Sequence, residues 1–142
     1  MKIYFVELLK PLPEAIEKLV KFHAILTKPE LGYSEKLLDY SHFIAYKSFR
    51  KKNHAKTFEL EWLSALACTN NIQKAVEFTR PGKTACIISP NKIEKNVLKS
   101  IGIKRKEKKN LQKLAAIYGI KTKKNMIETA LEQKICIAKM LD

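Results

Sequence analysis

Hydrophobic residues along the chain follow two different spacings, and three segments show the pattern of β-strands. Residues 2–8 form an apolar, β-rich run that ends just before a pair of prolines. Residues 22–27 return to an extended pattern, and residues 84–89 (TACIIS) are uncharged and rich in β-branched side chains. We therefore expect a first strand over 2–8 and an inner strand over 84–89, which is apolar on both faces.

Helical spacing covers most of the remaining chain. Apolar positions three and four residues apart predict helices over residues 14–21, 35–52, 55–68, 110–118 and a last one reaching 141. Asn70 followed by Gln73 has the spacing of a capping box, which predicts a short helix there. Ser89 before Pro90 favours another helix start, and that helix would end at Gly102. The result is an α+β fold, rich in helices, with three or four strands.

One of these helices is apolar on nearly its whole circumference. Between residues 55 and 68, the side chains Phe58, Leu60, Trp62 and Leu63 and their neighbours leave no wide polar face. A helix of this kind is central and buried. Glu61 falls inside the apolar surface, so its carboxylate is either paired within the protein or placed near a rim.

Length and charge narrow the classes of protein to consider. The chain has 142 residues, which fits one domain, and a formal net charge of +14. Of its 28 basic residues 25 are Lys, because Arg occurs only at positions 50, 80 and 105. The charge predicts a polyanionic partner, and lysine suits phosphates better than it suits the edges of bases in a duplex. No apolar run is long enough to cross a membrane, so we expect a cytoplasmic protein without a membrane partner.

The basic residues gather in three segments. They are Arg50, Lys51, Lys52, His54 and Lys56; then Lys104, Arg105, Lys106, Lys108 and Lys109; then Lys121, Lys123 and Lys124. Each segment could simply be a solvated loop or helix end, since lysines near a helix C-terminus favour its dipole. A charge of +14 nevertheless exceeds what solubility requires, and it would attract phosphates in a salt-dependent manner.

Few residues suggest catalysis or metal binding. Asp39 and Asp142 are the only aspartates, and the chain lacks the glycine-rich phosphate loops and the paired histidines of zinc helices. The three cysteines stand far apart without a CxxC pair, so we expect buried thiols rather than disulfides or a metal site. We therefore predict a protein that is not an enzyme and needs no cofactor. An enzyme would require Glu61 or Glu59 to work with His54 as an acid and base pair.

The last helix carries an apolar stripe that a lysine interrupts. The stripe consists of Ile127, Ala130, Leu131, Ile135, Ala138 and Leu141, with Lys134 in its middle. Such a stripe is usually core. A long lysine would be awkward in a fully buried face, so part of the stripe could instead lie at a rim and dock a partner.

Residues 53–75 carry a more specific pattern. In this segment Asn53 and Ala55 precede the apolar helix, Glu61 and Leu63 form a Glu-x-Leu core, and a polar turn leads to an Ile-x-x-Ala sequence at Ile72 to Ala75. This segment resembles the PRPK-binding protein family, the small kinase-binding subunit of the KEOPS complex. The family often has Gly or Ser where Cys68 and Thr69 stand in this chain.

The resemblance implies a fold and a function. It implies a single domain with an antiparallel sheet flanked by helices and no catalytic activity of its own. It further implies docking on the N-lobe of the complex's small atypical kinase, support of its ATPase activity, and help in recruiting tRNA through the 3′ CCA tail. The whole complex installs the threonylcarbamoyl group on adenosine 37, and the other subunits would be contacted only indirectly.

Two candidate surfaces follow. By resemblance, the kinase would bind the last helix, at Ile127, Leu131, Lys134, Ile135, Ala138 and Leu141. From charge, the tRNA surface would comprise Arg50, Lys51, Lys52, His54 and Lys56, with Arg80 and Lys83 brought near by the helix that follows Asn70. The alternative is a basic nucleic-acid-binding module that acts without a kinase.

Overall fold

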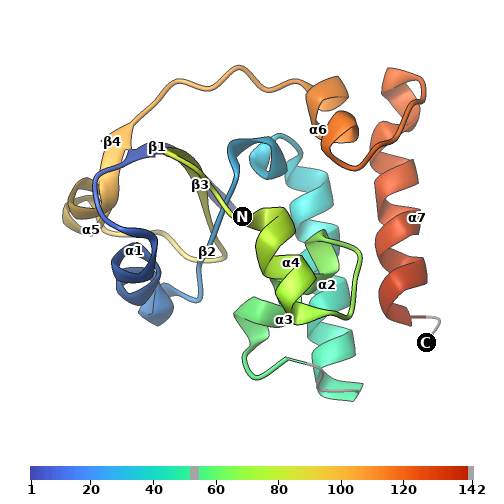
Figure 1. The fold of residues 1–142 in the computed structure, drawn as a ribbon, viewed down its shortest axis with the longest axis horizontal. Helices are drawn as coiled ribbons and strands as arrows, with labels where there is room; N and C mark the ends of the chain where they lie inside the picture. The colour runs from blue at the N-terminus through green and yellow to red at the C-terminus, as the bar shows by residue number, and fades with distance from the viewer. Residues whose placement is uncertain (52–54, 141–142) are drawn as a thin grey trace.

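The computed structural model of the chain describes residues 1–51 and 55–140. Over these residues it forms four strands, seven α-helices and three short 3-10 turns (Figure 1). The elements are β1 (Lys2–Leu8), α1 (Leu12–Leu19), β2 (Ile25–Thr27), α2 (Glu35–Lys51), α3 (Phe58–Leu66), α4 (Ile72–Thr79), β3 (Thr84–Ser89), α5 (Lys95–Ile101), β4 (Gly102–Lys104), α6 (Leu111–Ile117) and α7 (Ile127–Met140). The predicted α+β class is confirmed.

The strands form one antiparallel sheet in the order β2-β3-β1-β4. β1 and β3 are the inner strands, and Lys2 pairs with Ser89 at one end of their ladder. β3 is buried over nearly its whole length, as predicted for an uncharged inner strand. β2 and β4 are three residues long each and form the two edges of the sheet.

The alternation of side chains along β3 divides the core into two parts. Cys86 and Ile88 point to one face, where they pack with residues of α2, α3, α6 and α7. Ala85 and Ile87 point to the other face and pack with α1 and α5. Figure 1 shows the same division, with α1 and α5 beside the sheet on the left and the larger helical layer on the right.

The apolar helix predicted around residues 55–68 is α3, and it is central as expected. Trp62 and Leu66 are fully buried, and α3 packs against α2, α4 and α7. Buried indole N–H groups need an acceptor. The Trp62 Nε1 donates to Ser41 Oγ of α2 at 3.0 Å, which satisfies this need.

Two local predictions differ from the structure, and one short strand was not predicted. Asn71, not Asn70, caps α4, because its side-chain oxygen accepts from the Lys74 amide at 3.0 Å. The helix predicted to start at Ser89 starts at Lys95, because Ser89 Oγ accepts from the Asn91 amide at 3.1 Å and closes a turn instead. The edge strand β4 was not assigned from the sequence.

The turn after α3 contains a residue in a left-handed backbone conformation. Cys68 follows the C-cap of α3 with a φ of 57°. This is the left-handed conformation in which helices commonly end at glycine, because a side chain there is sterically disfavoured. The position therefore favours glycine, whereas this chain has Cys68 there.

Candidate functional site

A groove of about 440 Å³ opens between α1, β2, the start of α3 and α4. Its lining is mostly apolar, and several of these side chains are unusually exposed for their type: Ile16 is 47% exposed, Val20 58% and Val76 38%. Leu60 and Leu63 of α3 line its inner side. The groove therefore presents apolar surface to solvent next to the segment that carries the resemblance.

Charged and polar groups border this groove. Arg80, which follows α4, and Thr57, which caps α3, both line it. Lys56 precedes Thr57 and is exposed. Glu59 also lines the groove, and its carboxylate pairs with His23 Nδ1 at 3.0 Å. An apolar groove with cations at its border can bind a single-stranded nucleic acid, because the apolar surface packs against unstacked bases and the cations pair with the phosphates.

The predicted basic cluster is only partly brought together. Arg50 and Lys51 lie exposed in the last turn of α2, where the Arg50 guanidinium stacks 5.6 Å from the Tyr46 ring. Lys52 and His54 lie outside the described residues. Arg80 lines the groove together with Thr57, the residue after Lys56. Lys83 is exposed in the turn before β3.

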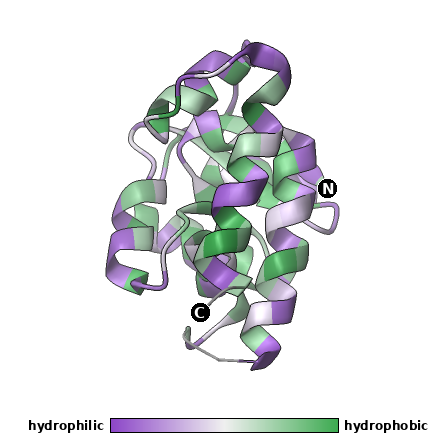
Figure 2. Cartoon of the chain, turned by 90° about the vertical axis from the view of Figure 1, so that its right-hand side faces the viewer, coloured by the Kyte–Doolittle hydropathy of each residue, from purple (hydrophilic) through white to green (hydrophobic). Residues whose placement is uncertain are grey.

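Three residues of the predicted partner face on α7 are core residues instead. Ile127, Leu131 and Ile135 are fully buried in the core against the neighbouring helices, so they are not accessible to a partner. Lys134 is exposed and Ala138 is half-buried, while Leu141 lies outside the described residues. Figure 2 looks onto this side of the molecule, and hydrophobic and hydrophilic turns alternate along the helices in front.

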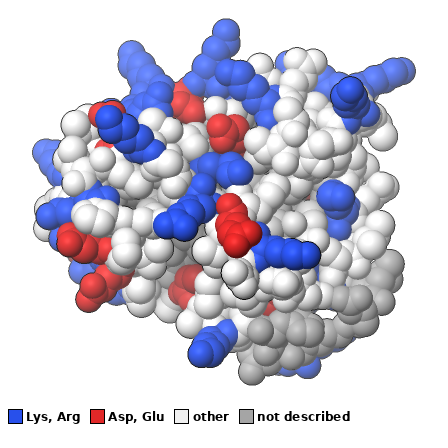
Figure 3. Space-filling view, in the orientation of Figure 1, with Lys and Arg blue, Asp and Glu red and all other residues white. Residues whose placement is uncertain are grey.

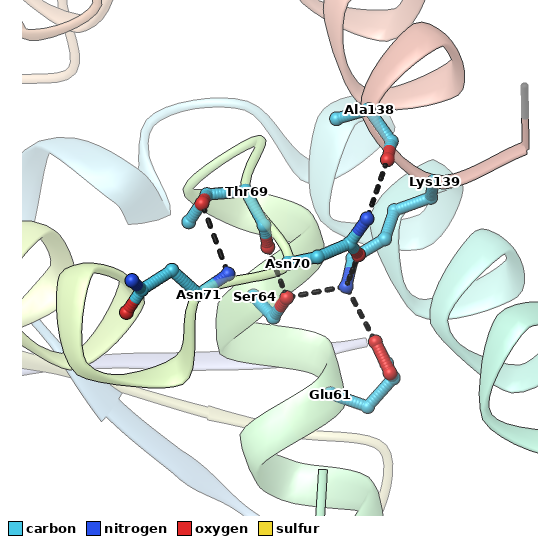
Figure 4. A network of polar contacts seen from close by, with 7 residues as sticks. All are labelled: Glu61, Ser64, Thr69, Asn70, Asn71, Ala138 and Lys139. Atoms are coloured by element: carbon cyan, nitrogen blue, oxygen red, sulfur yellow. Dashed lines mark hydrogen bonds and ion pairs between the residues drawn. The ribbon is translucent and has the colours of Figure 1, made fainter. Parts of the chain in front are cut away.

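The buried lysine of α7 is Lys139, and it forms a junction with α3 (Figure 4). Its ammonium donates to Glu61 Oε1 at 2.5 Å, to Asn70 Oδ1 at 2.8 Å and to Ser64 Oγ. Asn70 Nδ2 in turn donates to the Ala138 carbonyl at 3.2 Å. Of the two alternatives for Glu61, the paired interior position is therefore correct.

This geometry removes Glu61 from any acid and base pair at the surface. Both Glu61 and Lys139 have side chains with no solvent exposure. Glu59 pairs with His23 instead, and His54 lies outside the described residues. In the part of the chain that the structure describes, no three potential ligands gather in a way that could hold a metal ion.

Of the three cysteines, only Cys86 matches the prediction of buried thiols. Cys86 is buried, and Cys68 and Cys136 are half-buried without disulfides. Burial raises the pKa of Cys68 to about 11, although the ammonium groups of Lys134 and Lys139 oppose the shift. A thiol with such a pKa stays protonated at neutral pH and is a poor nucleophile.

The comparisons with known proteins found no family model that matches the chain and no match among curated proteins. Across residues 1–51 and 55–140, no helix is both long and apolar enough to span a membrane.

Proposed function

We propose that the chain is a non-catalytic accessory subunit of a KEOPS complex in the cytoplasm. In this role it binds the N-lobe of the small atypical kinase and helps to recruit tRNA through the 3′ CCA tail for threonylcarbamoyladenosine formation. The proposal rests on the resemblance of residues 53–75 and on the surface that this segment builds.

The groove beside α3 is the observation that supports the tRNA part. Thr57, Leu60 and Leu63 come from the resembling segment and line an exposed apolar groove, and Arg80 joins them from α4. A single-stranded tail needs apolar surface for its unstacked bases and nearby cations for its phosphates. This pairing of surfaces fits a tail better than it fits a duplex groove.

The kinase part depends on the resemblance and on a smaller surface than the sequence suggested. With Ile127, Leu131 and Ile135 in the core, the side chains of α7 that a partner can reach include Lys134 and Ile137, which is 61% exposed. A large exposed aliphatic side chain beside a cation is a reasonable centre for a small docking surface.

The decisive experiment measures binding of the protein alone to a tRNA and to the same tRNA lacking its 3′ CCA, at two salt concentrations. We expect tighter binding to the intact tRNA. Charge reversal at Arg50, Lys56 and Arg80 should remove this preference, whereas reversal of exposed Lys95 on α5 should leave it. Equal binding to both tRNAs would contradict recruitment through the tail.

A pull-down with the kinase subunit separates this role from the alternative, a basic nucleic-acid-binding module that acts alone. Salt-dependent RNA binding without any kinase capture would favour the alternative. The net charge of +14 is the observation that favours this second function.

A further inference from the structure

Residues 104–109 form an extended strap that connects β4 to α6 along one edge of the molecule (Figure 1). Exposure alternates along the strap, as it does along a strand. Lys104, Lys106 and Lys108 are exposed, whereas Arg105 and Glu107 between them are half-buried. Extended backbone thus directs every second side chain outward, and the outward side chains are lysines.

The strap is held in place at its ends and in its middle. The Arg105 amide donates to the Phe5 carbonyl at 2.9 Å, which extends the pairing of β4 with β1. Tyr33 donates its hydroxyl to Glu107 Oε2 at 2.7 Å, and the Arg105 guanidinium lies 3.7 Å from Glu107 Oε1. Asn110 then caps α6. The lysines therefore project from a fixed line of backbone.

The charge of this edge is strongly positive. The strap carries five Lys and Arg residues and one Glu, and that Glu is already paired with Arg105. Exposed lysines continue the positive charge beyond the strap, at Lys113, Lys121, Lys123 and Lys124. Figure 3, in the orientation of Figure 1, shows Lys and Arg side chains projecting along the edge over which the strap runs.

We infer that the strap binds the phosphate backbone of a nucleic acid. Side chains two residues apart on extended backbone are about 6.5–7 Å apart, a spacing similar to that of successive phosphates along a strand. Lysine acts as a point charge that suits phosphate and reads no base, so this contact is independent of sequence. Residues 104–109 offer no apolar side chain for insertion into lipid, which disfavours a membrane surface as the partner.

This surface is separate from the groove of the proposed function. The groove includes Ile25 and Leu26 of β2, and the strap continues β4, so the two lie at opposite edges of the sheet. The inference goes beyond tail recruitment, because it requires backbone phosphates and no free 3′ end. It stands or fails independently of the groove.

The test uses a blunt-ended RNA duplex, which has no single-stranded tail. In the strap variant, Lys104, Lys106 and Lys108 are changed to Gln; in the control variant, the exposed Lys47, Lys74 and Lys95 of three other helices are changed to Gln. Both variants lose the same charge. We expect the strap variant to bind the duplex at least tenfold more weakly in low salt. For this variant, the slope of the logarithm of the binding constant against the logarithm of the salt concentration should be shallower by about 0.9 for each lysine that contacts a phosphate.

Two outcomes would overturn the inference. Equal losses in the strap and control variants would mean that only the total charge acts. Binding to phosphatidylserine vesicles that falls in the strap variant while duplex binding is retained would assign the edge to lipid. Loss of CCA dependence alone would overturn only the proposed function.

Discussion

Lysine side chains are buried in one region of this molecule and exposed to solvent in another. At the junction of α3 and α7, the Lys139 ammonium is fully buried and contacts three side-chain oxygens. Along the strap, the lysines at positions 104, 106 and 108 are exposed to solvent. Their nearest backbone neighbours, Arg105 and Glu107, make the internal contacts in their place.

The difference shows how position decides what a charge does. Taking an ammonium out of water costs several kcal/mol, and only close partners offset that cost. The buried charge of Lys139 therefore serves to stabilise the fold. An exposed ammonium stays hydrated and contributes little to stability, so it can attract and bind an anion from solution.

The largest expected effect comes from Lys139→Ala, which would leave the Glu61 carboxylate buried without its cation. We expect the free energy of unfolding to fall by about 3–5 kcal/mol, measured by urea denaturation. The matched control is Lys134→Ala, on the same helix and exposed, which should change stability by less than about 0.5 kcal/mol. Equal effects of the two substitutions would mean that the buried lysine contributes no more to stability than an exposed one.

Glu61→Gln should have a smaller effect on the same junction. The amide keeps an oxygen near Lys139 but removes the negative charge. We therefore expect the free energy of unfolding to fall by about 1–3 kcal/mol, which thermal unfolding can measure. Glu17→Gln on exposed α1 serves as the control. Unchanged stability of Glu61→Gln would mean that Ser64 and Asn70 suffice for the ammonium.

His42 lies between the two extremes, because its ring is half-buried against Trp62 at 4.8 Å between centroids. Burial lowers the pKa of His42 and outweighs the nearby Asp39 carboxylate. The unfolded state then binds the proton more tightly, so stability should fall as pH drops through the ordinary histidine value of about 6.5. Unfolding measured against pH should show a weaker dependence in His42→Gln than in the parent.

The smallest effect on stability is expected at the strap. Replacing Lys104, Lys106 and Lys108 with Gln should leave the free energy of unfolding within about 0.5 kcal/mol of the parent for each position, because these side chains are exposed. The same variant is the one expected to lose duplex binding. A large loss of stability would show that the strap lysines serve the fold after all.

The inner strands and the central helix could be predicted from sequence because burial dictates their composition. β1 and β3 match the predicted ranges, and α3 is apolar on all sides. β4 has no such signal, since it has three residues and two of them, Ile103 and Lys104, are exposed. Its existence depends on pairing with β1, which is distant in sequence.

The junction escaped prediction for a related reason. On α7 the buried positions are Ile127, Leu131, Ile135 and Lys139, in steps of four residues. The predicted stripe contained Ile127, Leu131 and Ile135 but left out Lys139, because a lysine in the last turn of a helix is expected in solvent. What makes Lys139 an interior residue is Glu61, 78 positions earlier in the chain.

That separation also orders events during synthesis. Ribosomes release the N-terminal part of a chain first, and contacts distant in sequence form late. Glu61 therefore emerges long before Lys139, which neutralises it inside the fold, and its carboxylate is better solvated than buried until then. We therefore expect α7 to dock late in folding, because Lys139 makes a buried Glu61 favourable.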